Sequence, residues 1–150
     1  MNPASIRVTE KEIREAMKEV DPALLAVMKK SMENIRRYHE KQLKNSWFDT
    51  QPDGTILGQK VTALESVGVY VPGGKAAYPS TVLMDIIPAK VAGAERIVMV
   101  TPPGKDGKVN SVTLIAAHLA GANEVYKAGA LRLLPPLPLE QSPFPEWIRS

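Results

Sequence analysis

The stretch VGVYVPGGKAAYPSTVLM, residues 67–84, decides how the chain folds. An apolar run rich in β-branched residues leads into Pro72, Gly73 and Gly74, and a helix is predicted to begin near Pro79. The glycines let the backbone turn sharply and let a ligand approach it closely. A strand, a glycine loop and a helix in this order are typical of nucleotide-binding α/β proteins, although a tight turn without a ligand has the same pattern.

Further helices and strands follow this stretch in alternation. Residues 80–94 and 109–122 have helical patterns, with the apolar run RIVMV between them and the run EVYKAG after them. Pro88 is expected to bend or shorten the first helix, and Gly121 is well placed to end the second. This alternation predicts a parallel sheet, so the expected fold class is α/β with an incomplete Rossmann-like βαβαβ unit.

A helix pair and a hairpin are predicted before this sheet. Thr9 and Glu12 have the spacing of a capping box, and Asp21 followed by Pro22 is a second helix start signal. Within residues 47–61, the turn signal Pro-Asp-Gly predicts a hairpin. The side chains expected to face inward are Ile13, Ala16, Met17 and Val20 in the first helix, and Leu25, Met28, Met32 and Ile35 in the second.

The chain is expected to divide into a helical segment at 1–46, a partial nucleotide-binding α/β domain at 47–129 and an irregular proline-rich tail at 130–150. Its 150 residues suffice to bury a hydrophobic core without disulfide bonds or other crosslinks. The absence of cysteine excludes disulfides and thiolate metal sites and fits a reducing compartment. No apolar stretch resembles a signal peptide or a membrane span, so a cytoplasmic protein with no membrane partner is expected.

The net charge of +3 and the isoelectric point near 9.2 make the chain mildly basic. A basic set lies on the second helix, but acidic residues interrupt it and no aromatic ladder accompanies it. A solvated helix face is therefore favoured over a nucleic-acid surface, and no nucleic-acid partner is expected. The set consists of Lys29, Lys30, Arg36, Arg37 and Lys41.

Few residues carry a signal for catalysis or metal binding. His39 and His118 are the only histidines, and neither has a carboxylate or a second histidine at metal-ligand spacing. The chain contains neither the nucleophile motif GxSxG nor the phosphate loop GxxxxGK[ST]. These patterns predict no catalytic residue and no metal ligand.

The segment ESVGVYVPGGKAAYPSTVLMDIIPAKVAGAERIVMVTPP, residues 65–103, resembles histidinol dehydrogenase. This family uses zinc and NAD to oxidise an amino alcohol to histidine, the last step of histidine biosynthesis. The motifs that carry the resemblance are VGxYxPGG at 67–74, STVLM at 80–84, PAxxAG at 88–93 and the pair Pro102-Pro103. A looser likeness extends from Val8 to Gly129.

The resemblance implies that the chain contains residues of the cofactor site but not the family's catalytic residues. The positions that match the family's NAD contacts are Tyr70 and Pro72, and the backbone of Gly73 and Gly74 would pack against the dinucleotide. The family's zinc ligands, which are a glutamine, two histidines and an aspartate, and its proton-transferring Glu-His pair lie downstream of this region. Zinc is therefore not expected in this chain, and NAD binding is expected to be weak or absent.

The proline-rich ending after Gly129 departs from the family pattern. Codons can be chosen for residues 130–150 such that one restored G ahead of them makes the bases encode GAQAIAAFAFGTESIPGMDKI, which is similar to the family's continuation. The expectation is therefore a truncated internal fragment, which lacks a helical segment at its beginning and has an out-of-frame tail at its end.

Three functions compete at this point. The favoured one is a fragment of histidinol dehydrogenase that is inactive alone. The second is an active enzyme that takes its missing groups from another polypeptide. The third is a non-enzymatic binding module that uses the basic helix, or the tail segment PPLPLEQSPFP as a polyproline ligand. Because part of the sheet cover is expected to be missing, the chain is also expected to form a homo-oligomer.

Overall fold

The computed structural model describes residues 6–73 and 77–129 of the chain. The elements follow one another in the order α1 (Glu10–Glu19), α2 (Pro22–Glu40), β1 (Trp47–Thr50), β2 (Ile56–Gln59), β3 (Ser66–Tyr70), α3 (Pro79–Val91), β4 (Arg96–Thr101), α4 (Ser111–Ala120) and β5 (Glu124–Lys127). This order confirms the predicted helix pair, hairpin and βαβαβ unit. The predicted tail lies outside the described residues, and the division of the chain at residue 46 stays a prediction.

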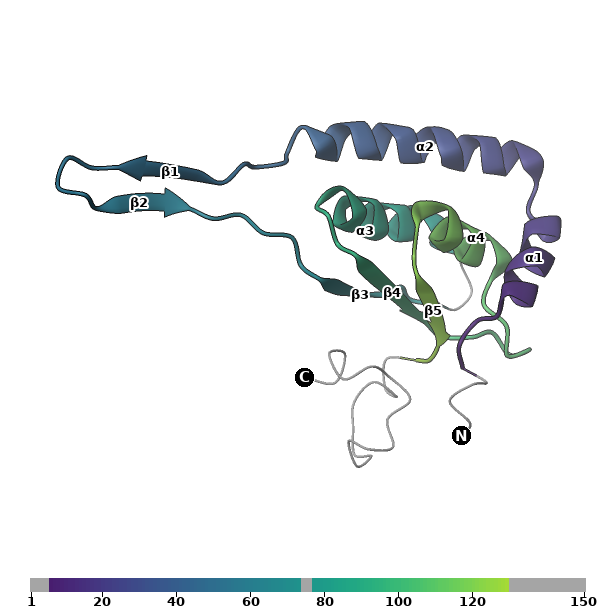
Figure 1. Cartoon of the computed structure of the whole chain (residues 1–150). Helices are drawn as coiled ribbons and strands as arrows, with labels where there is room; N and C mark the ends of the chain where they lie inside the picture. Colours follow the sequence, from purple (N-terminus) through teal and green to yellow (C-terminus); the bar gives the residue numbers. More distant parts are fainter. Residues whose placement is uncertain (1–5, 74–76, 130–150) are drawn as a thin grey trace, which may run out of the picture.

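The centre of the structure is a parallel sheet with the strand order β3-β4-β5 (Figure 1). Ile97 and Met99 of β4 are fully buried and pack toward the helices. The alternate residues form a second apolar cluster on the opposite face. Because both faces of the central strand are buried, its residues 97–100 form an uninterrupted apolar run. The second cluster consists of Ile6, Val98, Val100, Tyr126 and Ala128.

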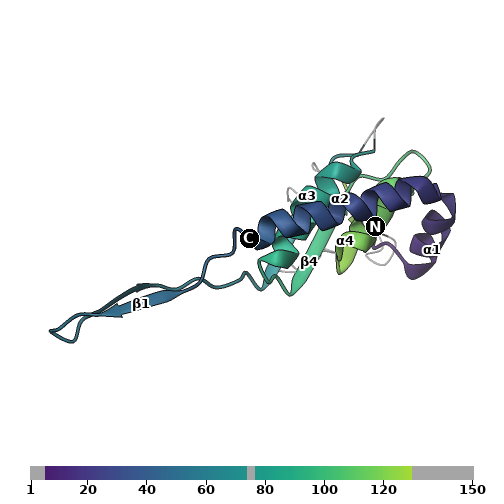
Figure 2. The ribbon, with the colours of Figure 1, turned by 90° about the horizontal axis from the view of Figure 1, so that it is seen from above.

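The helices form two layers beside the sheet. Figures 1 and 2 show α3 and α4 next to the sheet, α2 lying over them, and α1 beside α4. Fully buried Ile86 and Ile87 of α3 and Ile115 of α4 form the core of the first layer. None of the described helices combines the length and the apolar character that crossing a bilayer requires.

Local signals define most helix ends. Thr9 and Glu12 form the predicted capping box, Asp21 caps α2, and Gly121 ends α4 with a φ of +97°. Pro88 is expected to bend or shorten its helix, but it does not end the helix, because α3 continues past it to Val91. The burial of the preceding isoleucines outweighs the one backbone hydrogen bond that proline removes.

The outer edge of β5 is covered by the beginning of the described chain. The Val8 amide donates to the Val125 carbonyl at 2.8 Å, and the Lys127 amide donates to the Ile6 carbonyl. Lys127 also pairs with Glu12 of α1 at 2.8 Å. Burial raises the pKa of Glu12, but the hydrogen bonds from Lys127 and Thr9 outweigh that effect and hold the pKa below its usual value. These contacts tie α1 to the sheet.

Strands β1 and β2 form the predicted antiparallel hairpin, with Phe48 opposite Gly58. Gly54 turns the chain with a φ of +85°, and the Asp53 carboxylate accepts a hydrogen bond from the Thr55 amide. A Cβ atom at Gly58 would lie 2.5 Å from the ring of Phe48, so only glycine leaves room for this ring. Both figures show the hairpin extending away from the sheet and its helices.

Candidate cofactor site

The glycine loop after β3 packs directly on the loop after β4. The Val71 amide donates to the Val100 carbonyl at 2.9 Å, which extends the parallel ladder beyond Tyr70. A Cβ atom at Gly73 would lie 2.7 Å from the Pro102 ring and 2.8 Å from the Pro102 carbonyl oxygen. Gly73 is therefore required for the close approach of the two loops at the carboxyl ends of their strands.

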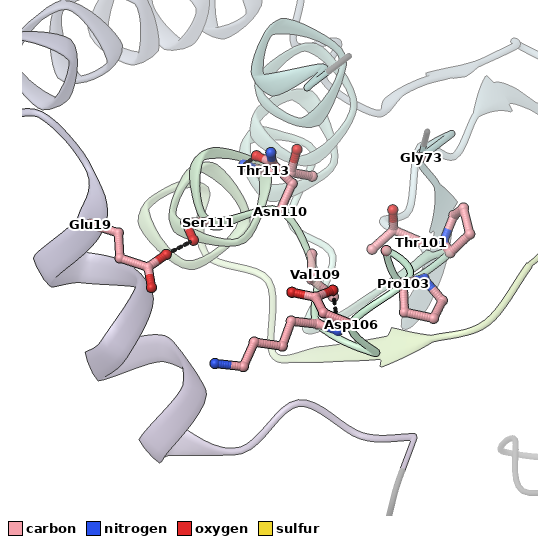
Figure 3. A pocket seen from close by; sticks show the side chains of 12 residues that line it. Glu19, Gly73, Thr101, Pro103, Asp106, Val109, Asn110, Ser111 and Thr113 are labelled. Atoms are coloured by element: carbon pink, nitrogen blue, oxygen red, sulfur yellow. Dashed lines mark hydrogen bonds between the residues drawn. The ribbon is translucent and has the colours of Figure 1, made fainter. Parts of the chain in front are cut away.

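A cavity of about 380 Å³ opens beside these two loops (Figure 3). Gly73 of the loop after β3 and Thr101 at the end of β4 line the cavity. The start of α4 and the end of α1 complete its wall. Carboxyl ends of parallel strands are where open α/β sheets bind their ligands. The remaining lining residues are Glu19, Pro102, Pro103, Gly104, Asp106, Lys108, Val109, Asn110, Ser111 and Thr113.

The start of α4 is already capped by residues of the cavity wall. The side-chain oxygen of Asn110 accepts hydrogen bonds from the amides of Val112 and Thr113, at 3.0 and 3.2 Å. The Ser111 hydroxyl donates to the carboxylate of Glu19 on α1. Because these groups occupy the helix terminus, it is a poor site for a phosphate.

Two buried hydroxyl groups and two exposed carboxylates line the cavity and determine which ligands it suits. Thr101 and Thr113 are 2% and 4% exposed, and neither hydroxyl has a hydrogen-bond partner among the described residues. The carboxylates of Glu19 and Asp106 accept hydrogen bonds, and that of Asp106 already accepts one from the Lys108 amide at 3.1 Å. This set suits a ligand that presents hydroxyl groups, such as a ribose, better than one that presents phosphates.

The first turn of α3 differs from that of α4. Its N-cap residue, Tyr78, makes no side-chain capping hydrogen bond. The helix begins at Pro79 and follows the glycine loop, as the sequence predicts. An uncapped first turn keeps backbone amides and a partial positive charge available to an anion.

The predicted cofactor residues do not all lie in one place. Gly73 lines the cavity, and exposed Pro72 immediately precedes it. Tyr70 is 41% exposed and alternates with buried Val69 and Val71, so its ring points to the sheet face opposite the helices. Gly74 lies outside the described residues. The cofactor role of these four residues stays a prediction.

No metal site is visible in residues 6–73 and 77–129, which contain no group of three His, Cys, Asp or Glu side chains able to hold an ion. The ring of His39 packs edge-on against Tyr38, with 5.3 Å between the centroids. His118 lies exposed on α4 and does not line the cavity. The described residues therefore do not fit zinc.

Sequence reasoning missed the part of the site that follows β4. The segment TPPGKDGKVN, residues 101–110, contributes most of the cavity wall. A signal was present, because this segment joins the carboxyl end of a predicted parallel strand to a helix and ends in the capping residue Asn110. The contribution of Glu19 had no signal, because it depends on how α1 packs against α4.

These features define a class: a Rossmann-like α/β unit with three parallel strands and a polar cavity at their carboxyl ends. Within this class, the sequence model of the family described as histidinol dehydrogenase matches residues 1–133. The chain belongs to the histidinol dehydrogenase family, and the resemblance read from its motifs is confirmed.

Individual relatives agree with this assignment. Histidinol dehydrogenase of Heliobacterium mobile is 57% identical over 129 residues, a match that covers 86% of this chain and 30% of the relative. That of Bacillus subtilis (strain 168) is 58% identical over 127 residues, covering 85% and 30%. The crystal structure of histidinol dehydrogenase from Elizabethkingia anophelis superposes with a TM-score of 0.78 at 36% identity, covering 83% of this chain and 29% of that one. The chain thus spans about 30% of the length of the curated relatives it matches.

Proposed function

We propose that this chain carries part of the NAD site of the histidinol dehydrogenase family and does not oxidise histidinol by itself. The observation that carries the proposal is the close packing of the Gly73 loop against Pro102 at the carboxyl edge of β3 and β4, beside a polar cavity. Membership of the family supports NAD as the ligand of this edge.

The residues at this edge suit different parts of a dinucleotide. The uncapped first turn of α3 would hold the pyrophosphate. Asp106 and the buried hydroxyl of Thr101 would bind ribose hydroxyls in the cavity. Tyr70 would contact the part of the ligand that crosses to the other face of the sheet. When bound, NAD accepts a hydride, and the residues named here would bind and orient it.

Affinity for NAD is expected to be no better than about millimolar, or roughly 4 kcal/mol. Part of a site makes few contacts to offset the translational and rotational freedom that the ligand loses. Tyr70→Ala should weaken binding by about fivefold through the lost aromatic contact. Tyr38→Ala removes a ring of the same size, which is also exposed, from the distant helix α2 and should leave binding unchanged.

Titration calorimetry with NAD on the purified full chain and both variants measures this. A micromolar constant that Tyr70→Ala abolishes would mean that the site is far more complete than proposed. Equal affinity of the unchanged chain and the Tyr70→Ala variant for NAD would show that Tyr70 is not part of the site.

A further inference from the structure

The loop between β4 and α4 holds the carboxylate of Asp106 at the cavity. The Gly104 amide donates to the Lys108 carbonyl at 2.8 Å, and the Gly107 amide donates to the Gly104 carbonyl at 3.0 Å, so the loop closes on itself. A Cβ atom at Gly104 would lie 2.9 Å from Asp106 Oδ1, and Gly107 has a φ of +77°. The two glycines therefore let the backbone fold closely around the Asp106 side chain.

The two carboxylate oxygens of Asp106 differ in their contacts. Oδ1 accepts a hydrogen bond from the Lys108 amide at 3.1 Å, which orients the group. Oδ2 has no hydrogen-bond or ion-pair partner within the described part of the chain. Because a carboxylate only accepts hydrogen bonds, Oδ2 can bind a hydroxyl group of a ligand but repels an anion.

Two buried hydroxyl groups line the cavity together with Asp106. Thr101 and Thr113 are 2% and 4% exposed, and their hydroxyls have no partner among the described residues. A buried hydroxyl without a partner has lost its hydrogen bonds to water, so a ligand that restores them is favoured. Figure 3 shows Asp106 between Glu19 on one side of the cavity and Thr101 on the other. Asp106 and Thr101 can therefore bind neighbouring hydroxyl groups of one ligand.

The place of Asp106 in the fold agrees with this chemistry. In dinucleotide-binding α/β units, an acidic residue downstream of the glycine loop binds the 2′-hydroxyl of the adenosine ribose, whereas a nearby arginine accommodates the 2′-phosphate of NADP. The first acidic residues after Gly73 are Asp85 on α3 and Glu95 before β4, and neither lines the cavity. Asp106 is the next acidic residue, and it does line the cavity.

The charges around the cavity disfavour a phosphate beside Asp106. Glu19 and Asp106 each contribute a carboxylate to the wall. Lys108 is the basic residue among the described ones that line the cavity, and its ammonium group lies 3.9 Å from Glu15 Oε2 on α1. No arginine lines the cavity within residues 6–73 and 77–129. A dianionic phosphate next to Asp106 would therefore meet a like charge without an arginine to balance it.

We propose that Asp106 selects NAD over NADP at this edge, by accepting a hydrogen bond from the 2′-hydroxyl of the adenosine ribose and repelling the 2′-phosphate that NADP carries there. This inference rests on the proposed function. Asp106 is the specificity-determining residue, and the buried Thr101 hydroxyl pairs with the neighbouring 3′-hydroxyl. Glu19 takes no part, because its carboxylate already accepts the Ser111 hydroxyl on the other side of the cavity.

Asp106→Asn tests this assignment on the isotope-labelled full chain. The substitution keeps an oxygen that can accept the hydrogen bond from the Lys108 amide, so the loop keeps its shape while the negative charge is lost. The unchanged chain should bind NADP more weakly than NAD by about tenfold or more. In Asp106→Asn the two dissociation constants should agree within about threefold, because NADP gains affinity and NAD loses one charge-assisted hydrogen bond. Nuclear magnetic resonance titrations with NAD and with NADP, followed at the Thr101 amide, give both constants.

Glu19→Gln provides a matched control within the same cavity. It removes the same charge from the other side and keeps an acceptor for the Ser111 hydroxyl, so the preference for NAD should stay within about twofold of that of the unchanged chain. Glu33→Gln on α2 controls for the net charge of the chain. The amide spectrum of each variant checks that the chain remains folded.

Three outcomes would overturn the inference while the proposed function stands, because NAD still binds in each. They are an unchanged chain that binds NADP as tightly as NAD, an Asp106→Asn variant that keeps the preference, and a Glu19→Gln variant that loses it. If neither dinucleotide shifts the amide signals at this edge, the proposed function fails and the inference fails with it.

Discussion

Purified chain incubated with histidinol and NAD is expected to form no NADH above background. A positioned acid or base contributes about 10²–10⁴-fold to such a reaction, and a metal that polarises the substrate contributes several kcal/mol more. Among the described residues, neither His39 nor His118 lines the cavity, and no side-chain cluster could hold an ion. The described residues therefore place neither a histidine nor a metal site at the cavity, and the role proposed for this edge is to bind the cofactor.

The assay follows NADH absorbance with and without added zinc, alongside metal analysis of the purified chain. The enzyme of Bacillus subtilis serves as the positive control, and expression in a host that lacks histidinol dehydrogenase removes contaminating activity. Turnover that copurifies with the chain from such a host, or zinc bound in equimolar amount, would refute the expectation.

Replacing Ile97 by alanine is expected to lower the free energy of unfolding by about 2–5 kcal/mol. Ile97 is fully buried in the central strand and contributes to the cluster that joins the sheet to α3 and α4. Since a domain is stable by only about 5–15 kcal/mol, this loss removes a large part of the total.

Urea unfolding of the variant, followed by circular dichroism, gives the loss directly. Leu64→Ala provides the control, because Leu64 is 71% exposed and its truncation should cost less than about 0.5 kcal/mol. Similar midpoints for the two variants would show that β4 is not the centre of the core.

Local signals in the sequence predicted the elements well. The capping box at Thr9, the cap at Asp21 and the end at Gly121 each depend on side chains or backbone angles within a few residues, so a linear reading finds them. The short apolar run RIVMV at 96–100 predicted a strand, and β4 is found there.

Contacts between segments that lie far apart in the chain could not be predicted from the sequence. The pairing of Val8 with Val125 and the ion pair of Glu12 with Lys127 join segments more than one hundred residues apart, and no periodic pattern encodes them. The residues of the candidate site show the same difference between local and distant signals. The Gly73 loop was predicted from its own residues, whereas the contribution of Glu19 follows only from the packing of α1 on α4.

The most direct test of the central claim, that the carboxyl edge of β3 and β4 is part of an NAD site, is a nuclear magnetic resonance titration of the isotope-labelled chain with NAD. We expect the amide shifts of Tyr70, Gly73, Thr101 and Asp106 to change, to saturate near millimolar NAD and to change less in Tyr70→Ala. No change at about 10 mM NAD, which corresponds to binding weaker than about 3 kcal/mol, or changes confined to α2 and the hairpin of β1 and β2, would contradict this claim.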